Sequence, residues 1–115
     1  MEPVDVVQAY FDEVYGERKV AAARRFLADP CLRHEHGELV EMSLEQNLDR
    51  IGHFLEQAPD LTFDSPILTG NAEFVTSCFN LMFGGRAISG IEVFRIVDGK
   101  IAETWNSTTQ SGRWG

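Results

Sequence analysis

The segment from Gly90 to Asn106, GIEVFRIVDGKIAETWN, constrains the fold of this chain more than any other segment. Its Asp98-Gly99 pair is a strong signal for a β-hairpin, because a tight turn between two strands needs residues that tolerate positive φ. Both faces of the strand before this turn are largely apolar, which indicates that the strand is covered on both sides. Since a carboxylate is costly to bury on such a strand, Glu92 is the first candidate for a functional residue.

Helical patterns occupy the first half of the chain. Residues 1–16 and 17–28 carry apolar side chains at helical spacing, and Asp29-Pro30 is expected to end the second helix because a residue before proline avoids the α region. A short extended piece is expected at 31–36, broken by Gly37. Ser43 and Gln46 form a capping box that predicts a third helix, from about 44 to 58.

Strand patterns occupy the second half. Four strands are expected at 61–68, 73–83, 86–97 and 100–109, joined as an antiparallel meander, with Pro66 marking an edge or a bulge in the first. Residues 110–115 are expected to form a loose tail. Helices followed by strands indicate an α+β fold, in one domain that spans residues 1–115.

The composition is that of a globular protein and excludes several classes of partner. The chain is 43% hydrophobic and 24% charged, and its formal net charge of -8 argues against nucleic acids and anionic membranes. No signal-peptide pattern or run of about 18 apolar residues is present, so a cytoplasmic location is expected. Cys31 and Cys78 lack metal-site spacing and are interpreted as buried free thiols. No cofactor is expected.

The order of these elements and the last hairpin resemble the nuclear transport factor 2-like superfamily, and its SnoaL-like and ketosteroid-isomerase-like branches most of all. Segments that carry the resemblance are VQAYF at 7–11, FLAD at 26–29, LRHEHG at 32–37 and the hairpin at 90–106, for which the family pattern is G-x-D-x-F-R-x-x-D-G-K-I-x-E-H-W-D. The resemblance implies a curved sheet that wraps around the three helices as a cone and encloses an apolar pocket. It says little about activity, because the fold hosts isomerases, cyclases, epoxide hydrolases and binding modules.

The resemblance also implies roles for particular residues. The isomerase branch uses a carboxylate base after its second helix, a carboxylic acid on the penultimate strand that apolar surroundings keep protonated, and a tyrosine on the first helix. These positions fall on Glu35, Glu92 and Phe11, and Phe11 has no hydroxyl. Tyr15 is near in sequence, whereas Tyr10 is expected to point about 100° away from Phe11.

Departures from the other branches weaken their chemistry in this chain. The cyclase branch uses the aspartate that ends E-H-W-D as its acid and base, and Asn106 stands there, with Thr104 in place of the histidine. The epoxide-hydrolase branch needs an arginine beside the carboxylate, but Gly90 and Phe94 occupy those positions next to Glu92.

The register of the last hairpin decides which residue faces Glu92. A two-residue turn at Asp98-Gly99 places Trp105 opposite Glu92, whereas a three-residue turn with a bulge places Thr104 there. We favour the bulged turn, because it puts Thr104 and Asn106 on the same inner face as Glu92.

The His34-Glu35-His36 motif has several interpretations. Alternation along a strand puts the two histidines on the face opposite Glu35, so they cannot all point inward. A metal site with His53 is the weakest interpretation, because two ligands are too few. A polar sheet edge or pocket rim is the plainest one, and His34 or His36 as a hydrogen-bonding residue of the pocket is the functional one.

Two hypotheses follow for the function. The first is a SnoaL-like isomerase or cyclase that moves a proton on a small apolar carbonyl compound, with Glu92 and Glu35 as catalytic residues. The second is a non-catalytic ligand-binding or dimerisation module on the same fold. An open pocket favours the first hypothesis, and a filled cone favours the second. The apolar outer face of Ile91 and Val93 predicts a homodimer through the sheet. The predicted substrate-binding residues are His34, Phe11, Tyr15, Phe54, Phe94, Thr104 and Asn106.

Overall fold

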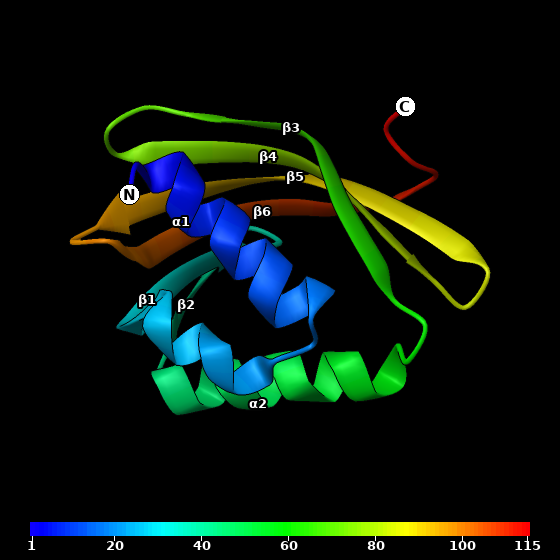
Figure 1. Cartoon of the computed structure of the whole chain (residues 1–115), viewed down its shortest axis with the longest axis horizontal. Helices are drawn as coiled ribbons and strands as arrows, with labels where there is room; N and C mark the ends of the chain where they lie inside the picture. Colours follow the sequence, from blue (N-terminus) through cyan, green and yellow to red (C-terminus); the bar gives the residue numbers. More distant parts are fainter.

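The computed structural model describes residues 1–115, apart from the side chains of Thr108 and Thr109. Its strands are β1 (Leu27–Glu35), β2 (Glu38–Met42), β3 (Thr62–Gly70), β4 (Phe74–Phe83), β5 (Arg86–Val97) and β6 (Lys100–Ser111). They form one curved, open sheet in the order β2-β1-β6-β5-β4-β3, and the helices lie together on one side of it (Figure 1). This arrangement confirms the expected α+β cone.

The helices differ from prediction in the second segment. α1 (Pro3–Tyr10) continues into the π-helical turn η1 (Phe11–Gly16), which ends at the predicted glycine. The expected helix at 17–28 is only the 3-10 helix η2 (Val20–Arg25), and β1 already begins at Leu27. That prediction was wrong because Phe26 and Leu27 are drawn into the core beside the sheet, so packing overrode the helical pattern. α2 (Leu44–Gln57) begins at the predicted capping box, where the Ser43 hydroxyl accepts from the Gln46 amide at 3.1 Å.

β1 changes the sheet from a four-strand meander to a mixed sheet of six strands. The predicted extended piece at 31–36 belongs to a nine-residue strand that pairs antiparallel with β2 and parallel with β6. Asp29-Pro30, expected to close a helix, lies inside β1. The β1–β6 pairing joins segments about 70 residues apart, for example His34 beside Trp105, and a local pattern holds no signal for such a contact.

The register of the last hairpin combines features of both predicted turns. Val97 pairs with Lys100 as a two-residue turn requires, but a bulge between Ile96 and Arg95 then shifts the ladder by one residue. As a result Asn106 lies opposite Glu92, and neither Trp105 nor Thr104 does, so both predicted partners were wrong. The predicted bulge in β3 is confirmed, between Asp64 and Ile67, on an edge strand.

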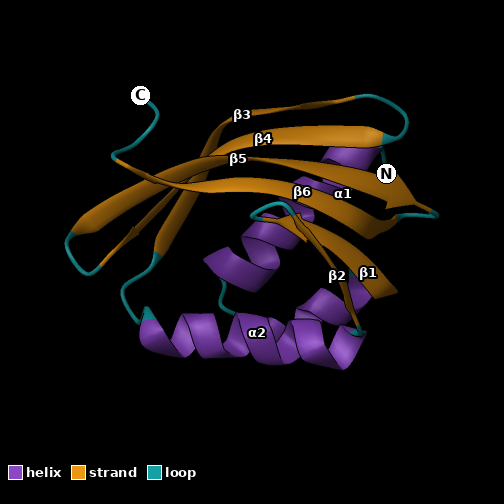
Figure 2. Cartoon of the chain, turned by 180° about the vertical axis from the view of Figure 1, so that it is seen from behind, coloured by secondary structure: helices purple, strands orange, loops and turns teal.

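The helices lie across one side of the curved sheet (Figure 2), and the hydrophobic core packs between helices and sheet. The side chains that pack there without solvent contact include Val7, Val14, Ala23, Ile51, Val75 and Ile101. The C-terminal residues, predicted to be loose, are held to the sheet. The Trp114 amide donates to the Asn80 side chain at 2.7 Å, and the Trp114 indole donates to the Gly90 carbonyl at 3.1 Å. Both cysteines are free, as predicted, with Cys31 buried and Cys78 half-buried.

Candidate active site

A cavity of about 240 Å³ lies between the inner face of the sheet and the helices α1, η1 and α2. Its volume exceeds the roughly 150 Å³ of a cavity that holds benzene and falls just short of the roughly 300 Å³ at which sites for larger ligands begin. The space therefore suits a compound of one or two rings. About half of its wall is apolar, made of Phe11, Leu27, Phe54, Phe63, Phe79, Leu81, Phe94 and Ile101.

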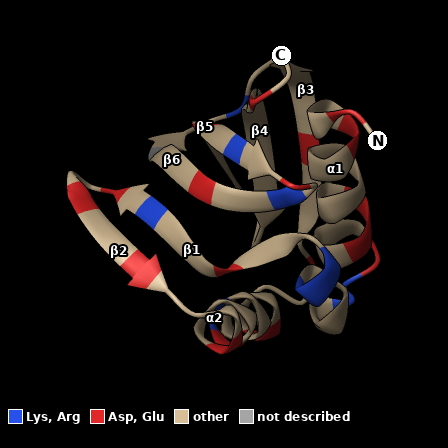
Figure 3. Cartoon of the chain, turned by 90° about the vertical axis from the view of Figure 1, so that its left-hand side faces the viewer, with Lys and Arg blue, Asp and Glu red and all other residues tan. Residues whose placement is uncertain are grey.

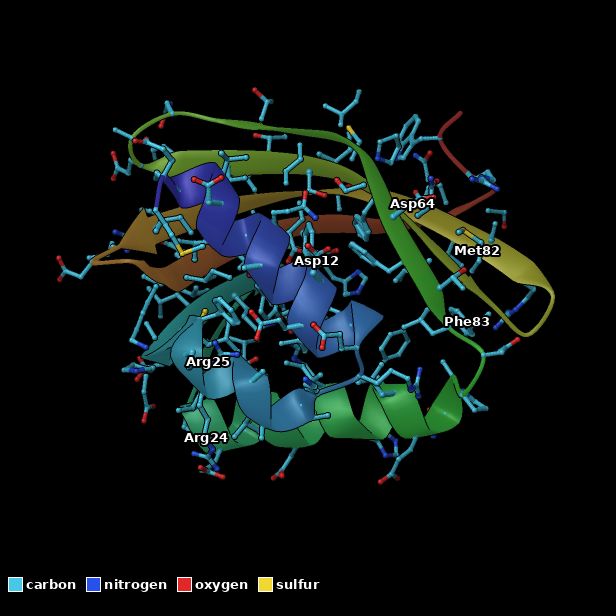
Figure 4. The ribbon with its side chains drawn as sticks, viewed as in Figure 1. Asp12, Arg24, Arg25, Asp64, Met82 and Phe83 are labelled. Atoms are coloured by element: carbon cyan, nitrogen blue, oxygen red, sulfur yellow. The ribbon has the colours of Figure 1, made fainter. Side chains whose placement is uncertain are left out.

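Aromatic rings in contact form the apolar end of the cavity. Phe63 lies at the centre of this group, with its ring centroid 4.6 Å from that of Phe11 and 6.0 Å from that of Phe79. Phe83 points from the end of β4 toward α2 (Figure 4), and its ring meets Phe54 edge-on at 5.8 Å. The predicted pocket residues Phe11, Tyr15, Phe54 and Phe94 all line this cavity. Phe74, an aromatic residue at the start of β4, packs on Trp105 instead.

Two tyrosines close one side of the cavity. In the π-helical turn the Glu17 amide donates to the Asp12 carbonyl at 2.8 Å, and this spacing aligns residues five apart. Tyr10 and Tyr15 are five apart, and their hydroxyls lie 3.4 Å from each other. Burial, more than the neighbouring Tyr15, raises the pKa of the Tyr10 phenol well above its usual value. Tyr10 therefore lines the pocket, although an ordinary helix was expected to direct it away from Phe11.

Glu92 stands on the inner face of β5 at the polar end. Asn106, directly opposite on β6, donates a side-chain hydrogen bond to it. Burial raises the pKa of the Glu92 carboxyl above its usual range, although the Arg33 charge, that hydrogen bond and the Arg50 charge act against it. Thr104 shares this face and is only 2% exposed, and among the described residues its hydroxyl has no hydrogen-bond partner. The predicted grouping of Glu92, Thr104 and Asn106 on one face is what the structure shows.

Glu35 enters the same cavity from the end of β1. The Arg33 side chain, two residues earlier on the same face, donates to the Glu35 carboxylate through Nε at 3.0 Å and also through Nη2. Burial alone would raise the pKa of Glu35, but the hydrogen bonds and charge of Arg33 outweigh it and hold the pKa below its usual range. The pKa values of Glu35 and Glu92, the two acids of the site, are therefore shifted in opposite directions.

Arg50 reaches the cavity from α2. Its guanidinium donates through Nε and Nη2 to the Asn47 side-chain oxygen at 3.2 and 3.1 Å, and no carboxylate among the described residues forms an ion pair with it. Burial lowers the pKa of Arg50, but the nearby Tyr15, Tyr10, Glu92 and Glu35 outweigh this and keep the pKa raised. Arg50 is thus a permanent positive charge in the pocket wall.

His34 lies outside the cavity, so its prediction as a substrate-binding residue was wrong. It stands on the outer face of β1, where its ring stacks on Trp105 at 5.0 Å and its Nε2 contacts Glu103 at 2.6 Å. Glu103 on β6 also pairs there with Arg95 on the neighbouring strand β5, at 3.0 Å, and Figure 3 shows charged residues side by side on these two strands. His36 does not share this face, because it follows β1 with a positive φ of 52° and lines the cavity rim.

Tyr10, Arg33 and Arg50 are the site residues that reasoning from the sequence missed. Arg33 had a usable signal, because strand alternation places it on the same face as Glu35. Arg50 had one too, since it lies one helical turn before the inward-facing Phe54. Among the described residues, no three His, Cys, Asp or Glu side chains gather in a way that would hold a metal, and no helix is long and apolar enough to span a bilayer.

Comparisons with known proteins agree with this geometry. The family model described as SnoaL-like polyketide cyclase matches residues 5–112. A SnoaL-like polyketide cyclase from Agrobacterium tumefaciens superposes with a TM-score of 0.80 at 17% identity, covering 96% of this chain and 94% of its own. IdmH from Streptomyces antibioticus gives 0.77 at 18% identity, covering 94% and 92%.

A protein of unknown function from Cytophaga hutchinsonii, described as NTF2-like, gives a TM-score of 0.73 at 13% identity and covers 95% of this chain and 92% of its own. Comparison with curated proteins finds none that matches. At these identities the superpositions show a shared fold, and the family model adds the family to which that fold belongs here.

Proposed function

Because the chain belongs to the SnoaL-like polyketide cyclase family, we propose that it binds a small, mainly apolar carbonyl compound in the cone and transfers a proton on it. The polar end of the cavity supplies two carboxyl groups, Glu35 and Glu92, and the remainder of the wall is mostly aromatic. In this proposal the substrate carbonyl points to the polar end and its rings lie against the phenylalanines. No cofactor takes part.

The opposite pKa directions of the two acids carry this proposal. Of two such carboxyls, the one whose pKa is raised holds its proton to a higher pH and can then donate a hydrogen bond, whereas the one whose pKa is lowered is the carboxylate that can accept a proton. Glu35 therefore acts as the base that removes a proton from the carbon next to the carbonyl. Glu92 acts as the acid that gives its proton to the carbonyl oxygen, and the product of this step is the enol.

The enol then determines which overall reaction results. Return of a proton to a different carbon gives an isomerisation, and attack of the enol carbon on a second carbonyl of the same molecule gives a cyclisation. Asn106 supports either outcome by holding the Glu92 carboxyl in place. Thr104, whose hydroxyl lacks a partner among the described residues, offers a further hydrogen bond at this end.

Hydrogen–deuterium exchange tests the proposed proton transfer without knowledge of the natural substrate. The two-ring ketone 2-tetralone fits the size of the cavity, and NMR in D₂O follows the loss of the protons next to its carbonyl. We expect the protein to accelerate this exchange, and Glu92→Gln to slow it by about 10²-fold or more, as loss of a general acid does. Glu56→Gln, at an exposed position on α2, is the matched control and should exchange at the rate of the unaltered protein. Unchanged exchange in Glu92→Gln would refute the assignment.

A ligand-binding module is the second candidate, and the Arg33–Glu35 ion pair favours it. An arginine bonded to the base lowers the basicity of that carboxylate and so weakens proton abstraction. Under this alternative, titration calorimetry should show that 2-tetralone binds in the cavity, and NMR should show that its protons exchange no faster than in buffer. The same experiment therefore separates the two functions.

We further infer that the outer face of the sheet is covered by a second copy of the chain. Ile91 and Ile67 remain 41% and 54% exposed there, and the Trp105 ring on the same face contacts the rings of His34 and Phe74. Apolar side chains that share one face of a small domain are typical of a subunit interface. Sedimentation equilibrium should give a dimer, and Ile91→Lys should give a monomer; a monomeric unaltered protein would refute the interface. The cytoplasmic location stays a prediction.

A further inference from the structure

Arg50 has a free hydrogen-bonding edge in the pocket wall. A guanidinium carries five N–H groups, and Asn47 takes those of Nε and one of Nη2. Three N–H groups, on Nη1 and Nη2, form no hydrogen bond with any described residue. That edge is the one on which a carboxylate or another planar anion binds through two parallel hydrogen bonds.

The other charged groups of the pocket do not satisfy Arg50. Arg33, the second cation, is paired with Glu35, which leaves Arg50 and Glu92. Glu92 is half-buried and accepts a hydrogen bond from Asn106, and among the described residues it forms no ion pair with Arg50. The cavity therefore presents one cation whose charge has no anion in direct contact among the described residues, and such a half-buried charge favours an anionic ligand.

Asn47 shows that the fold holds Arg50 in this position. Asn47 is fully buried, its oxygen bonds only to Arg50, and its side-chain nitrogen has no hydrogen-bond partner among the described residues. A buried amide left half satisfied reduces stability, so an apolar side chain of similar size would suit the core better. The gain from Asn47 lies in the orientation of the guanidinium. We therefore assign Asn47 as a positioning residue.

From this arrangement we propose that the ligand carries an acidic group that pairs with Arg50, next to rings held by the aromatic end of the cavity. Phe54 lies one turn further along the same face of α2, so the anion site and the apolar wall are adjacent. The ligand class is a one- or two-ring carbonyl compound that bears a carboxylate or an equally acidic enol. This inference rests on the proposed function, because it names the substrate class of the same pocket.

Two probes that differ only in charge test the anion site. Titration calorimetry at pH 7 compares 2-naphthoate with methyl 2-naphthoate, which has the same rings without the charge. A charge-assisted hydrogen-bonded pair is worth about 10- to 100-fold in affinity, so the acid should bind more tightly than the ester by that factor. Arg50→Gln should abolish this preference and change ester binding little. Arg24→Gln, exposed on the outer side of η2 (Figure 4), is the control and should keep it.

The variant Asn47→Leu tests whether Asn47 orients the Arg50 guanidinium or only supports the fold. This variant should unfold at a temperature equal to or above that of the unaltered protein, yet lose most of the preference for the acid. Equal binding of the two probes, binding of neither, or a preference that survives in Arg50→Gln would each overturn the anion site. Equal binding of the two probes would refute the anion site but not the proposed proton transfer by Glu92. Conversely, a preference for the acid without accelerated hydrogen–deuterium exchange would refute only the proton transfer.

Discussion

Replacement of Gly90 by alanine should destabilise the fold and shrink the cavity. Gly90 lies on β5 directly opposite Phe79 of β4, whose ring lines the pocket. A Cβ at position 90 would stand 2.7 Å from the Ser107 carbonyl oxygen and 2.8 Å from the tip of the Phe79 ring. Both contacts are well inside van der Waals distance, and the carbonyl belongs to the backbone of the paired strand, so it cannot move away cheaply.

The size of the effect follows from two opposing terms. Overpacking of a core typically costs about 1–3 kcal/mol, and a clash with backbone belongs in the upper part of that range. Alanine recovers about 0.5–1 kcal/mol over glycine through the entropy of the unfolded chain. The net loss is about 1–2 kcal/mol, which for a chain of this length lowers the melting temperature by about 4–8 °C.

Thermal unfolding, monitored by circular dichroism, measures the melting temperature of Gly90→Ala, with Gly52→Ala as the matched control. A Cβ at Gly52, inside α2, would meet only Val20 at 3.9 Å, an ordinary contact. The identical change should there raise stability by about 0.5–1 kcal/mol through helix propensity. Binding of methyl 2-naphthoate should weaken in Gly90→Ala, because the Phe79 ring is pushed into the cavity. A Gly90→Ala protein as stable as the original would refute the reasoning.

Three further predictions concern acidity, capping and the C-terminus. Because the folded pKa of Glu92 is raised, the free energy of unfolding should fall as pH rises from about 4.3, the value in the unfolded chain, to the folded pKa. Urea titrations should show Glu92→Gln without this part of the fall, and hence more stable than the original at neutral pH; an unchanged slope would contradict the burial argument. Ser43→Ala should cost about 1 kcal/mol by removing the cap of α2, measured as a lower urea midpoint. A chain that stops after Ser111 should lose about 1–3 kcal/mol because Asn80 loses its Trp114 donor, whereas a truly loose tail would cost nothing.

The elements that were predictable from sequence are those whose signals are local. The Ser43–Gln46 capping box and the Asp98-Gly99 turn each lie within four residues, and both occur where expected. The prediction of a helix at 17–28 failed because the same apolar side chains can also be buried from a strand, as Leu27 is at the start of β1. The prediction of a loose tail failed because the hydrogen-bond partners of Trp114, Gly90 and Asn80, lie 24 and 34 residues away in the sequence.

The candidate site was predictable to a similar extent. The choice of a bulged hairpin was what placed Glu92 and Asn106 on one face, since a shift of one residue in register turns every side chain of a strand to the other face. The partner of each residue was not predictable, because a single extra residue in the hairpin changes it. Arg50 was not predicted because charged residues on a helix are usually interpreted as solvent-facing, and only the structure shows that Arg50 lines the cavity.

The central position of β6 governs how this chain can be made. β6 is the last strand in sequence, yet it lies between β1 and β5 and joins the two halves of the sheet. As the chain leaves the ribosome, more than sixty residues must follow the end of β1 before its neighbour β6 is made. Until then the inner edge of β1 carries unpaired amides and carbonyls, the kind of edge that pairs with other chains. Emergence of β6 is thus the event that closes this edge and completes the cone.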